Sequence, residues 1–171
     1  GIVGHGDASH SIEIWAAFNI TGNASNVVTV TFTASAAFRK MWVGQYSGVA
    51  NTGAFDQNAV LLIDTLGTTH TTNTTGTTTQ ADELILTDYI SWSGTTSYVE
   101  VSPSNLRVAL GADLTGRTAL GDRIVAATGA YTTRVDTTLS TQQASIVRTF
   151  KAAAVTPFVI GSGISGPEYS G

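Results

Sequence analysis

The fold is decided by residues 143–151, Gln-Ala-Ser-Ile-Val-Arg-Thr-Phe-Lys, which alternate in character along their whole length. One face of this stretch carries Ala144, Ile146, Arg148 and Phe150, and the other carries Ser145, Val147 and Thr149. A period of two is what a β-strand requires, because successive side chains point to opposite faces of a sheet. The stretch predicts a strand.

Segments of the same kind recur along the chain. Strands are predicted at 11–19, 27–35, 37–46, 59–63, 83–93, 98–101, 107–110, 123–131 and 133–139, with a last apolar run at 158–160. The first two of these are expected to form a hairpin across the turn-forming residues 22–26. No segment predicts a substantial helix. The chain is therefore expected to be all-β, a β-sandwich or jelly roll of about eight to ten short antiparallel strands.

Threonine reinforces this prediction. The chain has 28 Thr in 171 residues, and ten of them lie between Thr65 and Thr79. Thr is β-branched and stiff at χ1, so it favours a pleated surface over a helix. The tract from Thr65 to Thr79 is predicted to be an edge strand, a long loop, or both in sequence. Its Thr spacing shows no fixed coil period, which argues against an ice-binding array.

Composition excludes several functional classes. Charged residues make up 12% of the chain and its net charge is −4, whereas nucleic-acid binding needs clustered Lys and Arg. The chain has no Cys, and no apolar run approaches the roughly 18 residues of a membrane span. It opens without a signal peptide, so export implies a removed leader. We expect one β-sandwich domain over residues 1–154 and a C-terminal extension over residues 155–171.

Several segments together resemble a family of secreted bacterial β-sandwich modules, mostly uncharacterised, found in extracellular and cell-surface proteins. The resemblance is carried by residues 11–15 (Ser-Ile-Glu-Ile-Trp), 28–32, 45–49, 78–85, 122–125, 128–131 and 144–152, in this order and at these spacings. It implies a sandwich and a surface location, and it implies no activity. Family members begin with further strands before residue 11 and end before residue 155. Three interpretations of the extension stay open. It supplies a strand to its own sandwich, it adds a strand to a neighbouring copy, or the chain is a fragment of a longer protein.

Candidate sites for metal and catalysis are sparse. His5, Asp7 and His10 lie within six residues and carry donors that suit a divalent metal, although an ordinary polar loop is the stronger interpretation. His70 is expected to be exposed within the Thr tract, outside any nucleophile motif. Acidic residues that could pair for glycoside hydrolysis are Asp82, Glu83, Asp88 and Glu100. Asp82 and Glu83 are better interpreted as solvent-exposed residues at the start of a strand.

Aromatic residues are the best candidates for ligand binding. Trp15 falls opposite Ile12 and Ile14, so it is either exposed or part of a second packed layer. Trp42 and Trp92 are expected to pack in the core. Exposed aromatic rings serve as platforms for sugars. Sequons for N-glycosylation occur at Asn19, Asn23 and Asn73.

These observations predict a non-catalytic structural or adhesive subunit, secreted or on the cell surface. It is expected to form a homo-oligomer or filament through its sheet edges and through Phe158, Val159 and Ile160 of the extension. The alternative is a carbohydrate-binding module that uses Trp15. No cofactor, nucleic acid or membrane span is expected.

Overall fold

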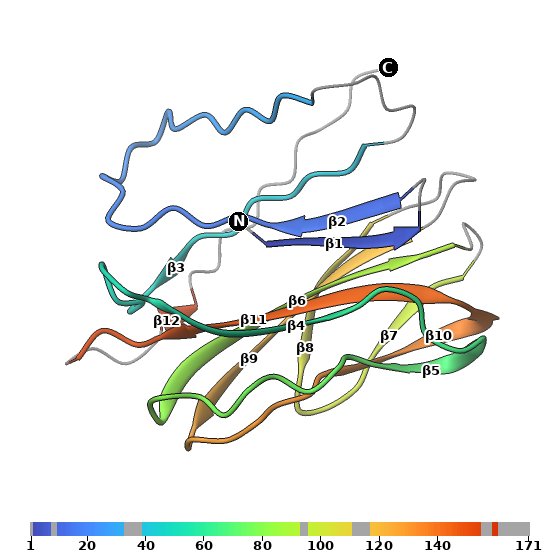
Figure 1. Ribbon diagram of the computed structural model, residues 1–171. Coiled ribbons are helices and arrows are strands. Elements are labelled where there is room, and N and C mark those ends of the chain that lie inside the picture. Colours follow the sequence, from blue (N-terminus) through green and yellow to red (C-terminus); the bar gives the residue numbers. More distant parts are fainter. Residues whose placement is uncertain are drawn as a thin grey trace.

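The computed structural model describes residues 2–7, 10–32, 39–92, 96–110, 117–154 and 159–160 (Figure 1). Within these ranges the chain forms strands and no helix, so none that could cross a membrane. The prediction of an all-β chain is confirmed. The strands are β1 (Ile2–Asp7), β2 (His10–Ile14), β3 (Tyr46–Ser47), β4 (Phe55–Leu61), β5 (Gly67–Thr71), β6 (Asp82–Ser91), β7 (Tyr98–Glu100), β8 (Asn105–Leu110), β9 (Arg117–Ala126), β10 (Arg134–Thr141), β11 (Gln143–Lys151) and β12 (Val159–Ile160).

The largest sheet has the order β4-β11-β6-β9-β8, with every neighbouring pair antiparallel. Its strand β11 spans the residues that the alternation predicted. It pairs with β6 over nine positions, from Gln143 opposite Ser91 to Lys151 opposite Glu83. Side chains on both faces of β11 are fully buried, as Ile146 and Val147 illustrate. Other parts of the chain must therefore cover both faces of the sheet.

One face is covered by a second sheet of order β5-β10-β7. Tyr89 and Ala119 of the large sheet pack there against Tyr98 and Val135 of the second sheet. The rings of Tyr89 and Tyr98 lie 6.4 Å apart in a tilted arrangement. Such tilted aromatic pairs are typical of well-packed interiors. This contact between the two sheets is the main core of the molecule.

The opposite face is covered by the β1-β2 ribbon (Figure 1). Ile12 and Ile14 of β2 are buried against Ile146, with Val60 and Ile90 packed beside them. The C-terminal strand β12 pairs antiparallel with β3 of the same chain. The extension thus contributes a strand within its own molecule.

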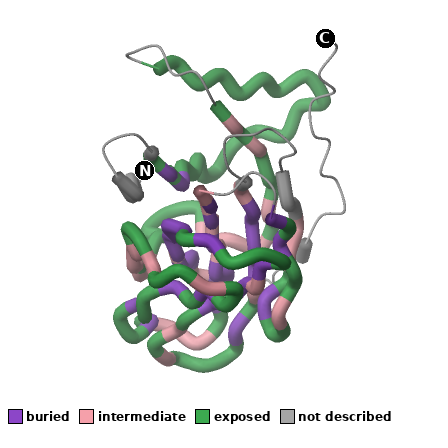
Figure 2. The backbone as a smooth tube through the Cα atoms, turned by 90° about the vertical axis from the view of Figure 1, so that its right-hand side faces the viewer, coloured by how far each residue is buried: buried purple, intermediate pink, exposed green. Residues whose placement is uncertain are grey.

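Two predicted strands are absent. Residues 27–32 and 39–45, which cover most of the strands expected at 27–35 and 37–46, form no strand, and the expected hairpin is wrong because β2 pairs with β1. The chain leaves the sheet after Ile14. Figure 2 shows the following residues as an exposed excursion beyond the packed layers. A period-two pattern is not enough to form a strand, since its backbone groups need a neighbouring strand to bond.

Candidate functional site

The most unusual surface is the excursion itself, which we call the arm and define as residues 15–32 and 39–45. All of its residues are exposed except Trp42, which is half-buried, and residue 40, which is likewise intermediate. Exposed large apolar side chains recur throughout the arm, at Trp15, Phe18, Ile20, Val27, Val28, Val30, Phe32, Met41 and Val43. Contiguous apolar exposure of this kind marks an interaction surface in a soluble protein.

Few contacts hold the arm to the packed layers. The Phe18 ring lies 6.0 Å from that of Phe150, near the point where the arm begins. Farther out, the backbone hydrogen bond from Asn26 N–H to Asn23 C=O closes a local turn, and the Arg39 guanidinium lies over the Phe32 ring at 5.6 Å. These contacts are local to the arm. In the described part of the chain, the arm has no strand partner.

Trp15 lies where the arm leaves the sheet, and 72% of its surface is exposed. Its indole N–H donates to Glu13 Oε2 at 2.7 Å, which fixes one edge of the ring. The sequence left open whether Trp15 is exposed or packed in a second layer, and in the structure it is exposed. The prediction that Trp42 and Trp92 pack in the core is wrong, because both side chains are only half-buried.

Other predicted residues fall near the chain ends. Asp7 stands opposite His10, and His5 opposite Ser11, across the β1-β2 ribbon. The side chains of the predicted metal ligands His5, Asp7 and His10 lie outside the described part of the structure. Phe158 is also outside the described residues. Val159 and Ile160 form β12, opposite Ser47 and Tyr46.

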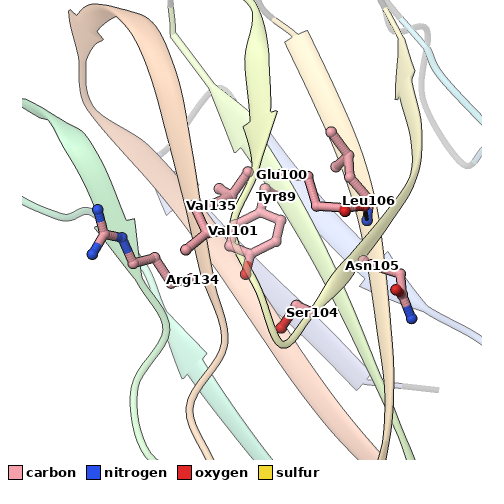
Figure 3. A pocket seen from close by; sticks show the side chains of 9 residues that line it. Tyr89, Glu100, Val101, Ser104, Asn105, Leu106, Arg134 and Val135 are labelled. Carbon is pink, nitrogen blue, oxygen red and sulfur yellow. Dashed lines mark hydrogen bonds between the residues drawn. The ribbon is translucent and has the colours of Figure 1, made fainter.

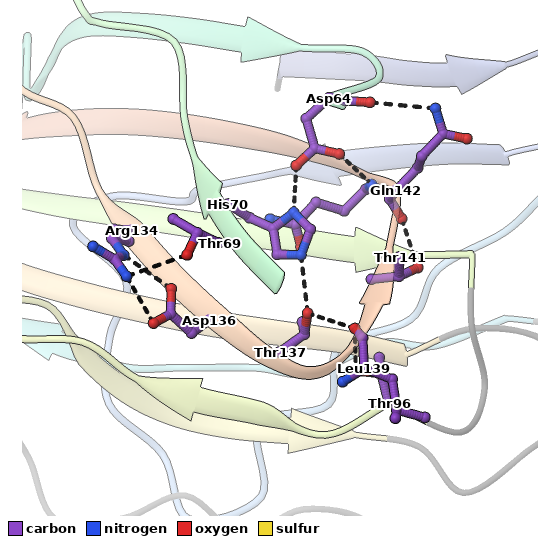
Figure 4. A network of polar contacts seen from close by, with 11 residues as sticks. Asp64, Thr69, His70, Thr96, Arg134, Asp136, Thr137, Leu139, Thr141 and Gln142 are labelled. Atoms are coloured by element: carbon purple, nitrogen blue, oxygen red, sulfur yellow. Dashed lines mark hydrogen bonds and ion pairs between the residues drawn. The ribbon is translucent and has the colours of Figure 1, made fainter. Parts of the chain in front are cut away.

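His70 is fully buried, so the expectation that it is exposed is wrong. Its Nδ1 contacts the Asp64 carboxylate, and its Nε2 lies 3.0 Å from Thr137 Oγ1 (Figure 4). Asp64 also accepts from the backbone N–H of Gln143 at 2.7 Å. The network joins the loop before β5 to β10 and β11. The imidazole of His70 can be fully buried because both of its ring nitrogens have polar partners.

This Asp64–His70–Thr137 arrangement has the connectivity of a hydrolytic triad. The Thr137 hydroxyl, however, has a second partner, the Leu139 carbonyl at 2.9 Å. Which of His70 Nε2 and Thr137 Oγ1 is the donor depends on the tautomer of the ring. His70 and Thr137 are also both buried. The geometry supports a structural role for this network.

The Thr tract has an order that the sequence analysis missed. Thr72, Thr75 and Thr78, which we call the threonine ladder, are buried at every third position. Each donates its backbone N–H to a carbonyl and accepts, on its hydroxyl oxygen, the N–H of that same partner residue. The partners are Thr133, Tyr131 and Gly129 respectively, at 2.9–3.1 Å.

The hydroxyl oxygens of the ladder replace the carbonyls that a paired strand would offer. Its partners step by two residues, which advances a strand about 7 Å. Three residues of the ladder cover the same length, so this stretch is more compact than a strand. Thr at period three is visible in the sequence, but the exposed residues Thr65, Thr68, Thr71, Thr74 and Thr77 have the same period, so the spacing alone does not identify the buried set.

The acidic residues also differ from expectation. Asp82 is exposed as predicted, but Glu83 is fully buried, and both of its carboxyl oxygens lack a hydrogen-bond partner of standard geometry. Burial, and then the neighbouring Asp56, raise the Glu83 pKa to about 7. Asp88, on the opposite face of β6, has a raised pKa caused by burial. Glu100 accepts from the backbone N–H of Leu106 at 2.7 Å. No two of the predicted acids form a pair.

Asp122 is a further buried acid that the sequence did not single out. It accepts from Tyr46 Oη and Asn105 Nδ2, each at 3.2 Å, and from Arg107 Nε at 2.5 Å. Burial and the adjacent carboxylate raise the Tyr46 pKa. Since Tyr46 follows the arm directly, this cluster fixes one end of the arm to the large sheet.

A shallow pocket lies beside Tyr89, where β7, β8 and β10 approach one another (Figure 3). It has room for little more than a water molecule. Its walls are formed by Tyr89, Glu100, Val101, Ser104, Asn105, Leu106, Gly121, Arg134 and Val135. A sugar ring or a cofactor does not fit into this pocket.

Comparison of the chain with protein-family models, with curated proteins and with solved structures found no match.

Proposed function

We propose that the protein is a non-catalytic structural or adhesive subunit, secreted or displayed on the cell surface, that assembles with copies of itself. The observation that carries this proposal is the arm, whose apolar residues are exposed and whose backbone has no strand partner within the described residues. Low charge and abundant Thr on the surface support an extracellular setting. The burial of both His70 and Thr137 supports the absence of hydrolytic catalysis.

Strand addition is the mode of assembly that suits the arm. Residues 27–32 alternate Val28, Val30 and Phe32 with threonines, and exposed backbone groups with such a pattern are a template for pairing with another chain. Both sheets offer edges to receive it: β4 and β8 end the large sheet, and β5 and β7 end the smaller one. The extension remains a second contributor, because the β12–β3 pairing can equally form between two copies.

The test is the mass of the native particle across a concentration series, measured by sedimentation velocity. We expect oligomers in the wild type and a shift toward monomer in Val30→Lys, because a charge on a pairing strand blocks edge-to-edge addition. Leu66→Lys is the matched control, since Leu66 is 71% exposed but lies outside the arm. A wild type that stays monomeric at every concentration would refute the proposal.

A second function is favoured by the exposure of Trp15. Its ring is open on the surface and oriented by Glu13, which suits stacking against a sugar. In this case the chain would be retained on a polysaccharide affinity gel, and Trp15→Ala would abolish that retention. No retention on a broad polysaccharide panel would exclude this alternative.

A further inference from the structure

Three reactive side chains meet on one face of the large sheet. Lys151 ends the inner strand β11, Glu83 stands directly opposite it on β6, and Asp56 lies on the other neighbour, β4. Lys151 Nζ lies 3.5 Å from Asp56 Oδ1. An amine, a carboxyl group and a second carboxyl group are thus brought together from three adjacent strands.

Hydrogen-bond donors surround the Asp56 carboxyl group. Thr79 donates its backbone N–H to Oδ2 at 2.6 Å and its hydroxyl to Oδ1 at 2.8 Å. The Asp56 side chain is only 4% exposed, whereas that of Lys151 is 29% exposed. The carboxyl group is therefore held in a fixed orientation, largely out of water, with the amine at one of its oxygens.

An ordinary ion pair does not account for Glu83. A Lys–Asp pair is complete with two members, and burying a third carboxyl group beside it is destabilising. Glu83 is nonetheless fully buried, and its carboxyl group interacts with that of Asp56 and with Thr149. A buried carboxyl group in contact with the reacting acid is placed to donate and accept a proton during a reaction.

We propose that Lys151 and Asp56 join in an intramolecular amide bond, with Glu83 as the proton carrier. Glu83 first carries one proton from the Lys151 ammonium to the Asp56 carboxylate, and the neutral amine then attacks the carboxyl carbon of Asp56, so that a carbon–nitrogen bond forms. A carbon–oxygen bond then breaks and one water leaves. The ammonium and the carboxylate together lose two hydrogens and one oxygen, so no oxidant or other reactant is needed.

Each neighbouring group has a defined part in this reaction. Glu83 accepts a proton from the attacking nitrogen and delivers one to the departing hydroxyl, and it ends in its initial state. Its raised pKa, about 7, suits a group that must do both near neutral pH. Thr79 donates its N–H to one carboxyl oxygen of Asp56 and its Oγ–H to the other, so the oxygen that keeps the negative charge has a donor whichever oxygen leaves.

The bond would tie the edge strand β4 to the inner strand β11 by a covalent link. β4 is one of the two edge strands of this sheet, so pulling or proteolysis detaches it more readily than an inner strand. The reaction occurs once per chain and is not turnover. This inference is independent of the arm and holds whether or not copies assemble.

Intact-mass spectrometry of the denatured full chain tests the proposal. We expect the folded wild type to weigh one water less than its sequence. Only Lys40 and Lys151 supply lysine amines, so Lys40→Arg is the matched control and should show the same loss. Lys151→Arg and Glu83→Gln should keep the full mass while remaining folded by circular dichroism.

Trypsin digestion of the wild type gives a readout that needs no variant. Cleavage after the amide-linked Lys151 is blocked, so residues 149–171 should appear joined to residues 41–107, which contain Asp56. Full mass in the wild type after long incubation from mildly acidic to mildly alkaline pH would overturn the proposal. A water loss that persists in Lys151→Arg would do so as well.

Discussion

Two Thr-rich stretches of this chain differ in whether they are buried and hydrogen-bonded within the chain. Residues 27–32 carry the better strand pattern, with Val28, Val30 and Phe32 at period two, yet all of them are exposed and form no strand. Residues 72–78 carry a poor strand pattern, yet the Thr at every third position is buried and bonded twice to the chain beside it. The stretch with the weaker pattern is the one built into the core.

A partner for the backbone, rather than local alternation, therefore decides which stretch is built into the core. The ladder lies beside residues 129–133, and its hydroxyls supply acceptors where its own carbonyls do not. The arm has the right side chains for a sheet and no strand to pair with in the described chain. A partner from another copy would satisfy this pattern, which is the basis of the assembly proposal.

The largest expected effect lies where the Thr-rich stretch enters the core, at His70. His70→Leu removes the contacts to Asp64 and Thr137 and leaves the Asp64 carboxylate without its buried partner. We expect a loss of about 3–5 kcal/mol in the free energy of unfolding, measured by urea denaturation. The double variant His70→Leu/Asp64→Leu should recover part of the loss. A single-variant loss below about 1 kcal/mol would contradict the structural role.

The next largest expected effect is the dependence of the free energy of unfolding on pH, caused by Glu83 in the packed layers. The Glu83 pKa is raised from 4.5 to about 7, so the folded state favours the protonated acid. As pH rises through this window, the unfolded chain ionises first, and stability should fall by up to about 3 kcal/mol. We would measure this in Lys151→Arg, which keeps the charge and cannot form the amide. Adding Glu83→Gln should flatten the profile between pH 4.5 and 7.

Asp56 titrates at lower pH than Glu83, so the effects of the two acids on stability occur in separate pH ranges. Its pKa is lowered to about 2, through hydrogen bonds from Glu83 and Thr79 that outweigh the opposing effect of burial. Its contribution to stability is present above pH 3.8 and should be lost as pH falls toward 2. A profile that stays sloped between pH 4.5 and 7 after Glu83→Gln would rule out Glu83 as its source.

The ladder itself should show an intermediate effect. Thr75→Val keeps the shape of the side chain but removes the acceptor for the Tyr131 N–H. An unpaired buried donor costs about 1–3 kcal/mol, and we expect a loss of that size in urea denaturation. Thr74→Val is the control, because Thr74 is exposed next to it and should change stability by less than about 0.5 kcal/mol. Equal effects at the two positions would show that the period of three has no energetic meaning.

The sequence predicted the fold class and the central strands because their side chains are buried on both faces or alternate cleanly. β11 matches its predicted bounds, and β6 and β7 lie within theirs up to one residue. Side-chain partners were beyond reach, because Asp64, His70 and Thr137 come together only through sheet packing. The same is true of Asp56, Glu83 and Lys151. Burial of Glu83 was missed because its neighbour Asp82 is exposed and made the pair look solvated.

The smallest expected effect on stability separates folding from assembly in the arm. Val30 is 51% exposed, so Val30→Thr should change the free energy of unfolding of the monomer by less than about 0.5 kcal/mol. The same change removes apolar contact from the proposed strand-addition surface, so it should weaken association in sedimentation velocity. Val135→Thr is the contrasting variant, since Val135 is buried between the two sheets and its change should destabilise the monomer. Loss of monomer stability in Val30→Thr would mean that the arm packs within its own chain, and the contrast between the two Thr-rich stretches would disappear.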